Sequence, residues 1–136
     1  MQDEKILELI NKKKIDNINE YSPLSLAFIG DAVHTLFVRS HIVSCENFNV
    51  NKYHSLSSAH CKASAQAKFL DEIKANLSAN EQDIIRRARN AKSHHTAKNA
   101  DIETYKKATS FEALIGYLFL TNQNDRLLEI LKKEEY

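Results

Sequence analysis

The two glycines of this 136-residue chain lie inside apolar segments that have the pattern of helices. Gly30 directly precedes Asp31. Gly116 follows Glu112 by four residues, which places Glu112 and Gly116 on the same face of their helix. A glycine inside a helix costs about 1 kcal/mol relative to alanine, and it is usually tolerated where two backbones approach closely. The simplest arrangement crosses the two helices at their glycines and sets Asp31 against Glu112. Two carboxylates held together repel unless a proton or a cation lies between them, so the pair predicts a metal site.

The surroundings of both acids argue against ordinary surface carboxylates. Asp31 and Glu112 are flanked mainly by large apolar side chains, and a helix that is apolar most of the way round is buried. A buried charge is costly unless it is paired or bound to a metal. A buried salt bridge to a lysine or an arginine is the alternative to a metal, and the sequence leaves it open.

Length and composition favour one helical domain. A chain of 136 residues can build a core of its own, and two glycines and one proline leave few turn-forming residues. No stretch alternates apolar and polar residues as a strand would. We therefore expect an all-α fold, with a single domain over 1–136 that includes an N-terminal helical extension over 1–20.

Three further features bear on the protein's setting. Cys45 and Cys61 form no CxxC pair, and no signal-peptide pattern opens the chain. The uninterrupted apolar runs are far shorter than a membrane span. We therefore expect a cytoplasmic protein without a membrane partner. The net charge of +1 gives no global indication of nucleic-acid binding, so such a function depends on local clusters.

Capping residues and apolar periodicity predict where the helices lie. Ser22 before Pro23 is a strong helix start, Ser78 to Glu81 matches a capping box, and Asp101 is a candidate cap. The predicted elements are, in chain order, a first helix ending at 12–14, a helix over 23–39, a loop over 45–51, one long or two abutting helices over 52–77, a helix over 79–91, a loop over 94–100, a short helix leading into the segment of Glu112, a break at 122–124 and a last helix over 127–131.

Two segments resemble the signature helices of the ribonuclease III endonuclease domain. They are Phe-Ile-Gly-Asp-Ala-Val at 28–33 and Phe-Glu-Ala-Leu-Ile-Gly-Tyr-Leu at 111–118, in the order and at the separation of that family. Between them, Arg-Asn-Ala-Lys-Ser at 89–93 and Lys-Asn-Ala-Asp at 98–101 are similar to the compact bacterial form, Mini-ribonuclease III. That form lacks the double-stranded-RNA-binding domain of its larger relatives. The resemblance covers about residue 21 to the C-terminus.

The resemblance implies a homodimeric endoribonuclease that cuts double-stranded RNA and leaves 5′-phosphate and 3′-hydroxyl ends. It implies Mg²⁺ as the cofactor, with Mn²⁺ as a substitute, and Asp31 and Glu112 as the catalytic, metal-binding residues. It implies that Phe28 inserts into the partner subunit at the dimer interface. It also implies a role in ribosomal RNA maturation, on the 23S precursor.

Three positions depart from the larger members of the family. Ala27 and Thr109 stand where those proteins carry a glutamate and an aspartate, and Gln66 stands near the place of a further glutamate. In these substitutions the chain resembles the compact form. They imply a site with fewer acids, and they leave the number of metal ions and the turnover rate open.

A basic cluster between the signatures is the candidate RNA-binding surface. Duplex RNA is recognised mainly through shape, phosphates and 2′-hydroxyls, and a catalytic domain without an accessory module must supply these contacts itself. The residues expected to contact RNA are Arg86, Arg87, Arg89, Asn90, Lys92, Ser93, Lys98 and Asn99. A solvated helix face is the alternative. His94 and His95 are expected in a surface loop, and His34 as a packed or interface residue.

Three functions therefore remain open at the level of sequence. The first is the metal-dependent endonuclease. The second is a catalytically silent protein of the same fold that binds RNA or the ribosome. The third is a helical interaction protein whose acids pair with basic residues. The presence of both Asp31 and Glu112 favours the nuclease.

Overall fold

The computed structural model describes residues 10, 13–92 and 101–136. All regular structure in these ranges is helical, which confirms the expected all-α class. The elements are η1 (Ile18–Glu20), α2 (Pro23–Cys45), α3 (Val50–Cys61), α4 (Ala63–Ile73), η2 (Lys74–Asn76), α5 (Ala79–Asn90), α6 (Ile102–Leu120) and α7 (Asn124–Leu131). The first helix and the loop over 94–100 expected from the sequence lie wholly or almost wholly outside the described residues.

The local signals at the helix ends act as the sequence predicts. The Ser22 side chain accepts a backbone hydrogen bond at the start of α2, and Ser78 and Glu81 form a reciprocal capping box at the start of α5. The Asp101 side chain accepts the backbone N–H of Thr104 at the start of α6. The break after α6 is confirmed at Asn122, whose φ of 61° is left-handed and ends the helix.

The helix boundaries differ from the expectation at α2 and α6, and an alternative left open over 52–77 is resolved. α2 continues beyond 39 to Cys45, because no glycine or proline interrupts it and Ile42 still packs into the interior. Of the two arrangements expected for 52–77, the structure has the two abutting helices, since Lys62 is extended and separates α3 from α4. The segment of Glu112 has no separate short helix before it, because α6 runs without a break from the Asp101 cap.

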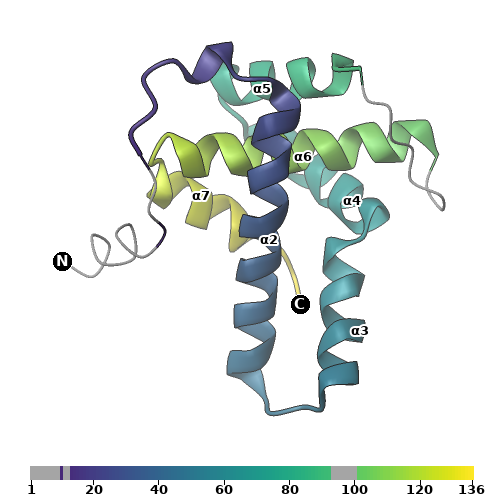
Figure 1. Ribbon diagram of the computed structural model, residues 1–136. Coiled ribbons are helices and arrows are strands. Elements are labelled where there is room, and N and C mark those ends of the chain that lie inside the picture. The colour runs from purple at the N-terminus through teal and green to yellow at the C-terminus, as the bar shows by residue number, and fades with distance from the viewer. Residues whose placement is uncertain (1–9, 11–12, 93–100) are drawn as a thin grey trace.

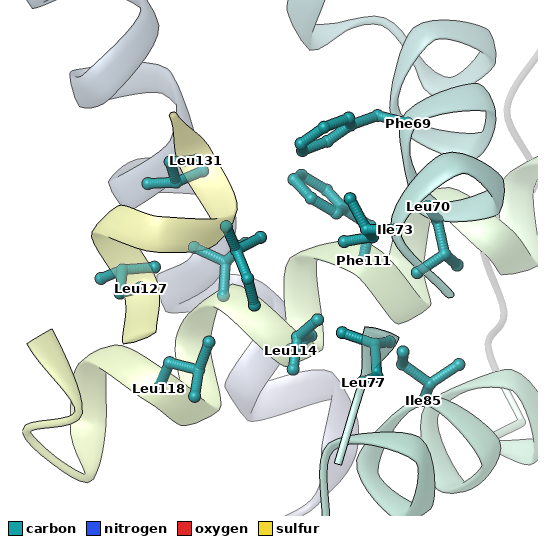
Figure 2. Packing of buried hydrophobic residues seen from close by; sticks show 12 residues of the cluster. Phe69, Leu70, Ile73, Leu77, Ile85, Phe111, Leu114, Leu118, Leu127 and Leu131 are labelled. Carbon is teal, nitrogen blue, oxygen red and sulfur yellow. The ribbon is translucent and has the colours of Figure 1, made fainter. Parts of the chain in front are cut away.

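α6 lies at the centre of the fold, and α2, α4, α5 and α7 pack around it (Figure 1). Phe111, Leu114, Ile115 and Leu118 of α6 are completely buried. Figure 2 shows the main apolar cluster, in which side chains of α4, α5 and α7 meet those of α6. Each such fully buried side chain contributes about 1.5–3 kcal/mol of transfer free energy, so α6 is the element on which the others depend.

α2 buries one face and leaves the other open. Leu26 and Val38 are fully buried, whereas Phe28, Leu36 and Val43 are 83%, 65% and 56% exposed. The exposed three follow one another at spacings of eight and seven residues, so they form one stripe along the helix. We call Phe28, Leu36 and Val43 the outer stripe of α2.

By length and composition α2 could cross a membrane, and a third of its most apolar window is buried. The expectation from uninterrupted apolar runs did not foresee this. A long core helix passes the same test, and α2 has Asp31 and His34 near its middle and packs along α6. These features are those of a core helix.

Candidate functional site

The backbones of α2 and α6 touch at Gly30 and Gly116. A Cβ atom placed on Gly30 would lie 1.7 Å from the Glu112 carbonyl oxygen, and one placed on Gly116 would lie 1.8 Å from the Leu26 carbonyl oxygen. Neither position has room for any side chain. The helix crossing predicted from the two glycines is therefore confirmed. It sets the distance between Asp31, which follows Gly30, and Glu112, which lies one turn before Gly116.

This crossing brings Asp31 and Glu112 together. Their carboxyl groups are hydrogen-bonded to each other, and burial, together with the Asp31 carboxyl, raises the pKa of Glu112 to about 8. Glu112 is half-buried, but Asp31 is exposed. The expectation that both acids are buried is therefore wrong for Asp31. Its apolar neighbours on the outer stripe face solvent and do not cover it.

The salt-bridge alternative finds no support in the described part of the chain. There, no lysine or arginine lies within ion-pair distance of Asp31 or Glu112, and the ion pairs of Arg and Lys connect other elements. The most buried of these joins Arg126 to Glu81, through two hydrogen bonds of 2.9 Å. It ties α7 to α5, away from the carboxylate pair.

Gln66 of α4 is the third side chain at the pair. It is 3% exposed, and its amide hydrogen-bonds Glu112, which opposes the upward shift of the Glu112 pKa. The neighbouring positions carry no acid: Ala27 is buried one turn before Asp31, and Thr109 is half-buried one turn before Glu112. The site therefore consists of two carboxylates and one amide.

Behind Gln66 lies His34, which is 1% exposed and hydrogen-bonded at both ring nitrogens. Its Nδ1 lies 3.2 Å from the Gln66 amide and its Nε2 lies 3.0 Å from Glu134 Oε2. The expected packed role of His34 is confirmed, but its partner Glu134 was not foreseen. No local pattern marks it, because the two residues are 100 positions apart.

The charge state of His34 follows from these contacts. Burial alone would lower its pKa, but hydrogen bonds to Cys61 and Glu134 and the charge of Glu134 raise the pKa of His34 to about 9. A cationic ring donates from both nitrogens, so the Gln66 carbonyl oxygen then faces Nδ1. The Gln66 amide N–H is left to donate to Glu112. A half-turn of the amide exchanges these two atoms without changing the packing.

The donor atoms at the pair suit a hard divalent cation. Carboxylate oxygens are the ligands that Mg²⁺ prefers, and one or two of them commonly suffice together with waters and substrate phosphates. The raised pKa of Glu112 reflects charge repulsion that a cation would relieve. The described residues contain no cluster of three or more His, Cys, Asp or Glu side chains that could hold a metal ion. The residues present thus fit a Mg²⁺ ion with few protein ligands.

The arginines of the predicted RNA-binding cluster have different surroundings. Arg86 is exposed and pairs with Asp83 within α5, whereas Arg87 donates to the backbone carbonyls of Asn19 and Tyr21 at 3.1 and 3.4 Å. Arg87 therefore holds the segment before α2 in place. RNA contact by this cluster stays a prediction.

The rest of the cluster lies at the end of α5 and beyond it. Arg89 forms a bidentate pair with Glu103, which joins the end of α5 to the start of α6. Asn90 and Lys92 are exposed. The remaining candidates lie outside the described residues; they are Ser93, Lys98 and Asn99, with His94 and His95 between them.

The sequence matches known proteins over most of its length. The family model described as the ribonuclease III domain matches residues 24–123. A Mini-ribonuclease 3 of Thermoanaerobacter sp. (strain X514) is 45% identical over 125 residues, which are 92% of this chain and 86% of the relative. The Mini-ribonuclease 3 of Clostridium tetani (strain Massachusetts / E88) is 44% identical over 117 residues, 85% of this chain and 78% of the relative.

The fold matches a solved structure as well. A crystal structure of a protein from Fusobacterium nucleatum superposes with a TM-score of 0.79 at 28% sequence identity. The match covers 89% of this chain and 95% of that protein. The helical arrangement around α6 is therefore shared with an experimentally determined structure.

Proposed function

Because this chain belongs to the ribonuclease III family, within the group of Mini-ribonuclease 3 proteins, we propose that it is an endoribonuclease that cuts double-stranded RNA at the Asp31–Glu112 pair. The observation that carries the proposal is the carboxyl–carboxyl contact at the crossing of α2 and α6. Near neutral pH, such a contact makes the metal-free fold less stable, because two carboxyl groups repel when both are charged. Unfavourable contacts of this kind are typical of functional sites, and a bound Mg²⁺ would relieve the repulsion.

Asp31, Glu112 and Gln66 have distinct tasks in this proposal. A bound Mg²⁺ would activate a water molecule and stabilise charge on the phosphate and the leaving oxygen. Exposed Asp31 offers its carboxylate on the side open to RNA. Half-buried Glu112 holds a proton in the metal-free protein below about pH 8 and presents a carboxylate once that proton has left. Gln66 keeps the Glu112 carboxyl oriented through its amide.

The proposal extends to the assembly and the biological role. One carboxylate pair cuts one strand, so cleavage of both strands calls for two copies of the chain, and the outer stripe of α2 is the surface we assign to their contact. We further propose Mg²⁺ as the metal, with Mn²⁺ as a substitute, and 5′-phosphate and 3′-hydroxyl product ends. The substrate we propose is the 23S ribosomal RNA precursor, in the cytoplasm and away from membranes.

Substitution of either acid tests the proposal. Asp31→Asn or Glu112→Gln should abolish Mg²⁺-dependent cleavage of a labelled RNA duplex, because each removes a metal-binding charge. Binding of the duplex should persist, since the arginines of α5 are unchanged. Glu72→Gln is the matched control, as Glu72 is exposed on α4. Cleavage at the wild-type rate by either site variant would refute the assignment, and a wild-type protein that binds without cutting would be the silent form.

The biological role is tested separately. Cells without the protein should accumulate 23S precursor with unprocessed ends, and the wild-type chain but not Glu112→Gln should restore the mature ends. Unchanged precursor in these cells would refute the ribosomal substrate and leave the nuclease assignment intact.

A further inference from the structure

The last residues of the chain reach the back of the carboxylate pair. Glu134 follows α7, and the C-terminal end lies between α2 and α3 (Figure 1). Tyr136 contacts His41 of α2 and His60 of α3, with ring centroids 4.1 and 4.4 Å apart. These contacts on both sides hold the segment in place although it belongs to no helix.

The Glu134 carboxylate is shielded within this arrangement. Its side chain is only 8% exposed, and its two oxygens lie 3.0 Å from His34 Nε2 and 3.4 Å from His60 Nδ1. A carboxylate can only accept, so His34 donates from Nε2 whether its ring is neutral or cationic. Glu134 thereby fixes the ring of His34 with Nδ1 directed at Gln66.

A continuous line of hydrogen bonds therefore runs from the end of the chain to the site. It passes from Glu134 to His34, from His34 to Gln66 and from Gln66 to Glu112. His34 and Gln66 are at least 97% buried, where polar groups cost stability unless they are fully bonded. Leucine or methionine would fill the same space at lower cost, so the polar line needs an explanation beyond packing.

We propose that Glu134 is a positioning residue for Glu112, acting through the hydrogen bonds of His34 and Gln66. This inference rests on the proposed nuclease function of the pair. A side chain in the last three residues of the sequence thus orients a carboxylate that the central helix supplies. Partners behind metal-binding side chains typically change metal affinity or activity about 10–100-fold when they are removed.

Two neighbouring glutamates provide a matched test. Glu134→Ala removes the acceptor for His34 Nε2, whereas Glu135→Ala makes the same change at an exposed residue one position away. For Glu134→Ala we expect cleavage of the duplex at saturating RNA to fall about 10–100-fold, with little change in KM for RNA. Glu134→Gln keeps an acceptor oxygen toward His34 and should recover most of the lost rate. Glu135→Ala should match the wild type.

A second measurement does not depend on catalysis. In the metal-free protein, the His34 Nε2–H proton should be protected from exchange and visible by NMR, and Glu134→Ala should abolish this signal and shift the Gln66 side-chain amide resonances. Glu135→Ala should leave both unchanged. A Glu134→Ala protein with wild-type rate and resonances would overturn the inference. So would a loss of rate that circular dichroism traces entirely to unfolding, or a Glu134→Gln variant as slow as Glu134→Ala.

The two proposals fail in different ways. If the wild-type chain cuts no duplex, the nuclease function is refuted, while the resonances of His34 and Gln66 still report whether Glu134 orients them. If the wild type cuts and Glu134→Ala cuts equally fast, only the positioning role is refuted.

Discussion

The carboxyl groups of Asp31 and Glu112 contact each other, but the environments of the two side chains differ. Asp31 is open to water, whereas Glu112 is shielded and is bonded to the buried Gln66. Burial disfavours charge on Glu112 and the contact adds repulsion, so its carboxyl keeps a proton well above the usual pKa of 4.5. Ionisation of this one residue is therefore unfavourable in the metal-free fold, and a cation at the pair would remove much of that penalty.

Glu112→Gln should stabilise the metal-free protein at high pH. The Glu112 carboxyl has a pKa of about 8 in the folded chain and 4.5 in the unfolded chain. Its protonated form therefore contributes stability to the fold. This contribution is complete below pH 4.5 and is lost as the pH rises through 8. Glutamine has no proton to lose. Allowing for partial exposure, we expect its advantage in free energy of unfolding to reach about 2 kcal/mol at pH 9.

Urea unfolding in the presence of a chelator, at pH 5, 7 and 9, measures this difference. Glu72→Gln, which changes an exposed glutamate of α4, serves as the control and should show no such trend. A Glu112→Gln advantage that stays constant with pH would mean that Glu112 is already ionised in the metal-free protein.

The sequence predicted the carboxylate pair but not all that surrounds it. The pair follows from helical spacing and the cost of glycine, which are local properties of the segments around Gly30 and Gly116. The exposure of Asp31 depends on what covers the outer side of α2, and periodicity carries no information about that. The partnership of His34 with Glu134 joins positions 100 residues apart, so no local pattern could indicate it.

At the scale of elements, the crossing of α2 and α6 depends on two missing side chains. Gly30→Ala and Gly116→Ala should each destabilise the fold by about 3 kcal/mol or more, because the added methyl group meets backbone atoms that cannot move aside. In an unhindered helix the same change would stabilise by about 1 kcal/mol, so even the sign of the effect is informative.

Thermal unfolding of both variants measures this effect. Ala65→Gly in α4, at a half-buried position, gives the ordinary cost of glycine in a helix of this protein. An unchanged or raised midpoint for Gly30→Ala would show that the two backbones do not touch in solution.

The contacts of α5 indicate different roles for two neighbouring arginines, RNA binding for Arg86 and a structural role for Arg87. Arg86 is exposed, and its neighbour Arg87 is bonded to the segment before α2. Arg86→Ala should weaken duplex binding and flatten the slope of log affinity against log salt, by up to about 0.9 on the scale measured for B-DNA. Arg87→Ala should leave that slope unchanged and lower the stability instead.

These slopes are measured with the Glu112→Gln protein, which we expect to be catalytically inactive. Its affinity for duplex RNA is determined at several salt concentrations between about 50 and 200 mM. Equal slopes for Arg86→Ala and the parent would mean that this face of α5 is only solvated and that the RNA contacts lie elsewhere.

Element boundaries show what local chemistry can specify. The caps at Ser22, Ser78 and Asp101 were visible in the sequence because each supplies an acceptor to its own first turn. The end of α2 was not, since its last residues are stabilised by packing of Ile42 and not by a stop signal. Over 52–77 the sequence left one long helix and two abutting helices open, because no glycine or proline marks the division at Lys62.

At the scale of the whole molecule, the described elements leave the outer stripe of α2 without a partner. Phe28 is 83% exposed, although it belongs to the helix that supports the carboxylate pair. Large apolar side chains gathered on one exposed face are typical of a protein–protein interface. A two-fold contact through this stripe would place two carboxylate pairs in one particle, as cleavage of both strands requires.

Phe28→Ala should therefore dissociate the proposed dimer without disturbing the monomer. Truncating an aromatic residue in a well-packed interface costs about 3–5 kcal/mol, which corresponds to more than a hundredfold in Kd. Sedimentation velocity at micromolar concentration should show a dimer for the wild type and a monomer for the variant. Ile102→Ala, at an exposed apolar residue of α6 that lies outside the stripe, should remain dimeric.

The same variant connects assembly with chemistry. Because Asp31 and Glu112 come from one chain, a monomeric Phe28→Ala protein keeps its carboxylate pair and should still nick single strands of a duplex. Cuts through both strands at one place should fall far more than nicks, which gel electrophoresis under native and denaturing conditions distinguishes. A wild-type protein that sediments as a monomer yet cuts both strands together would refute the dimer, and with it the role of the outer stripe.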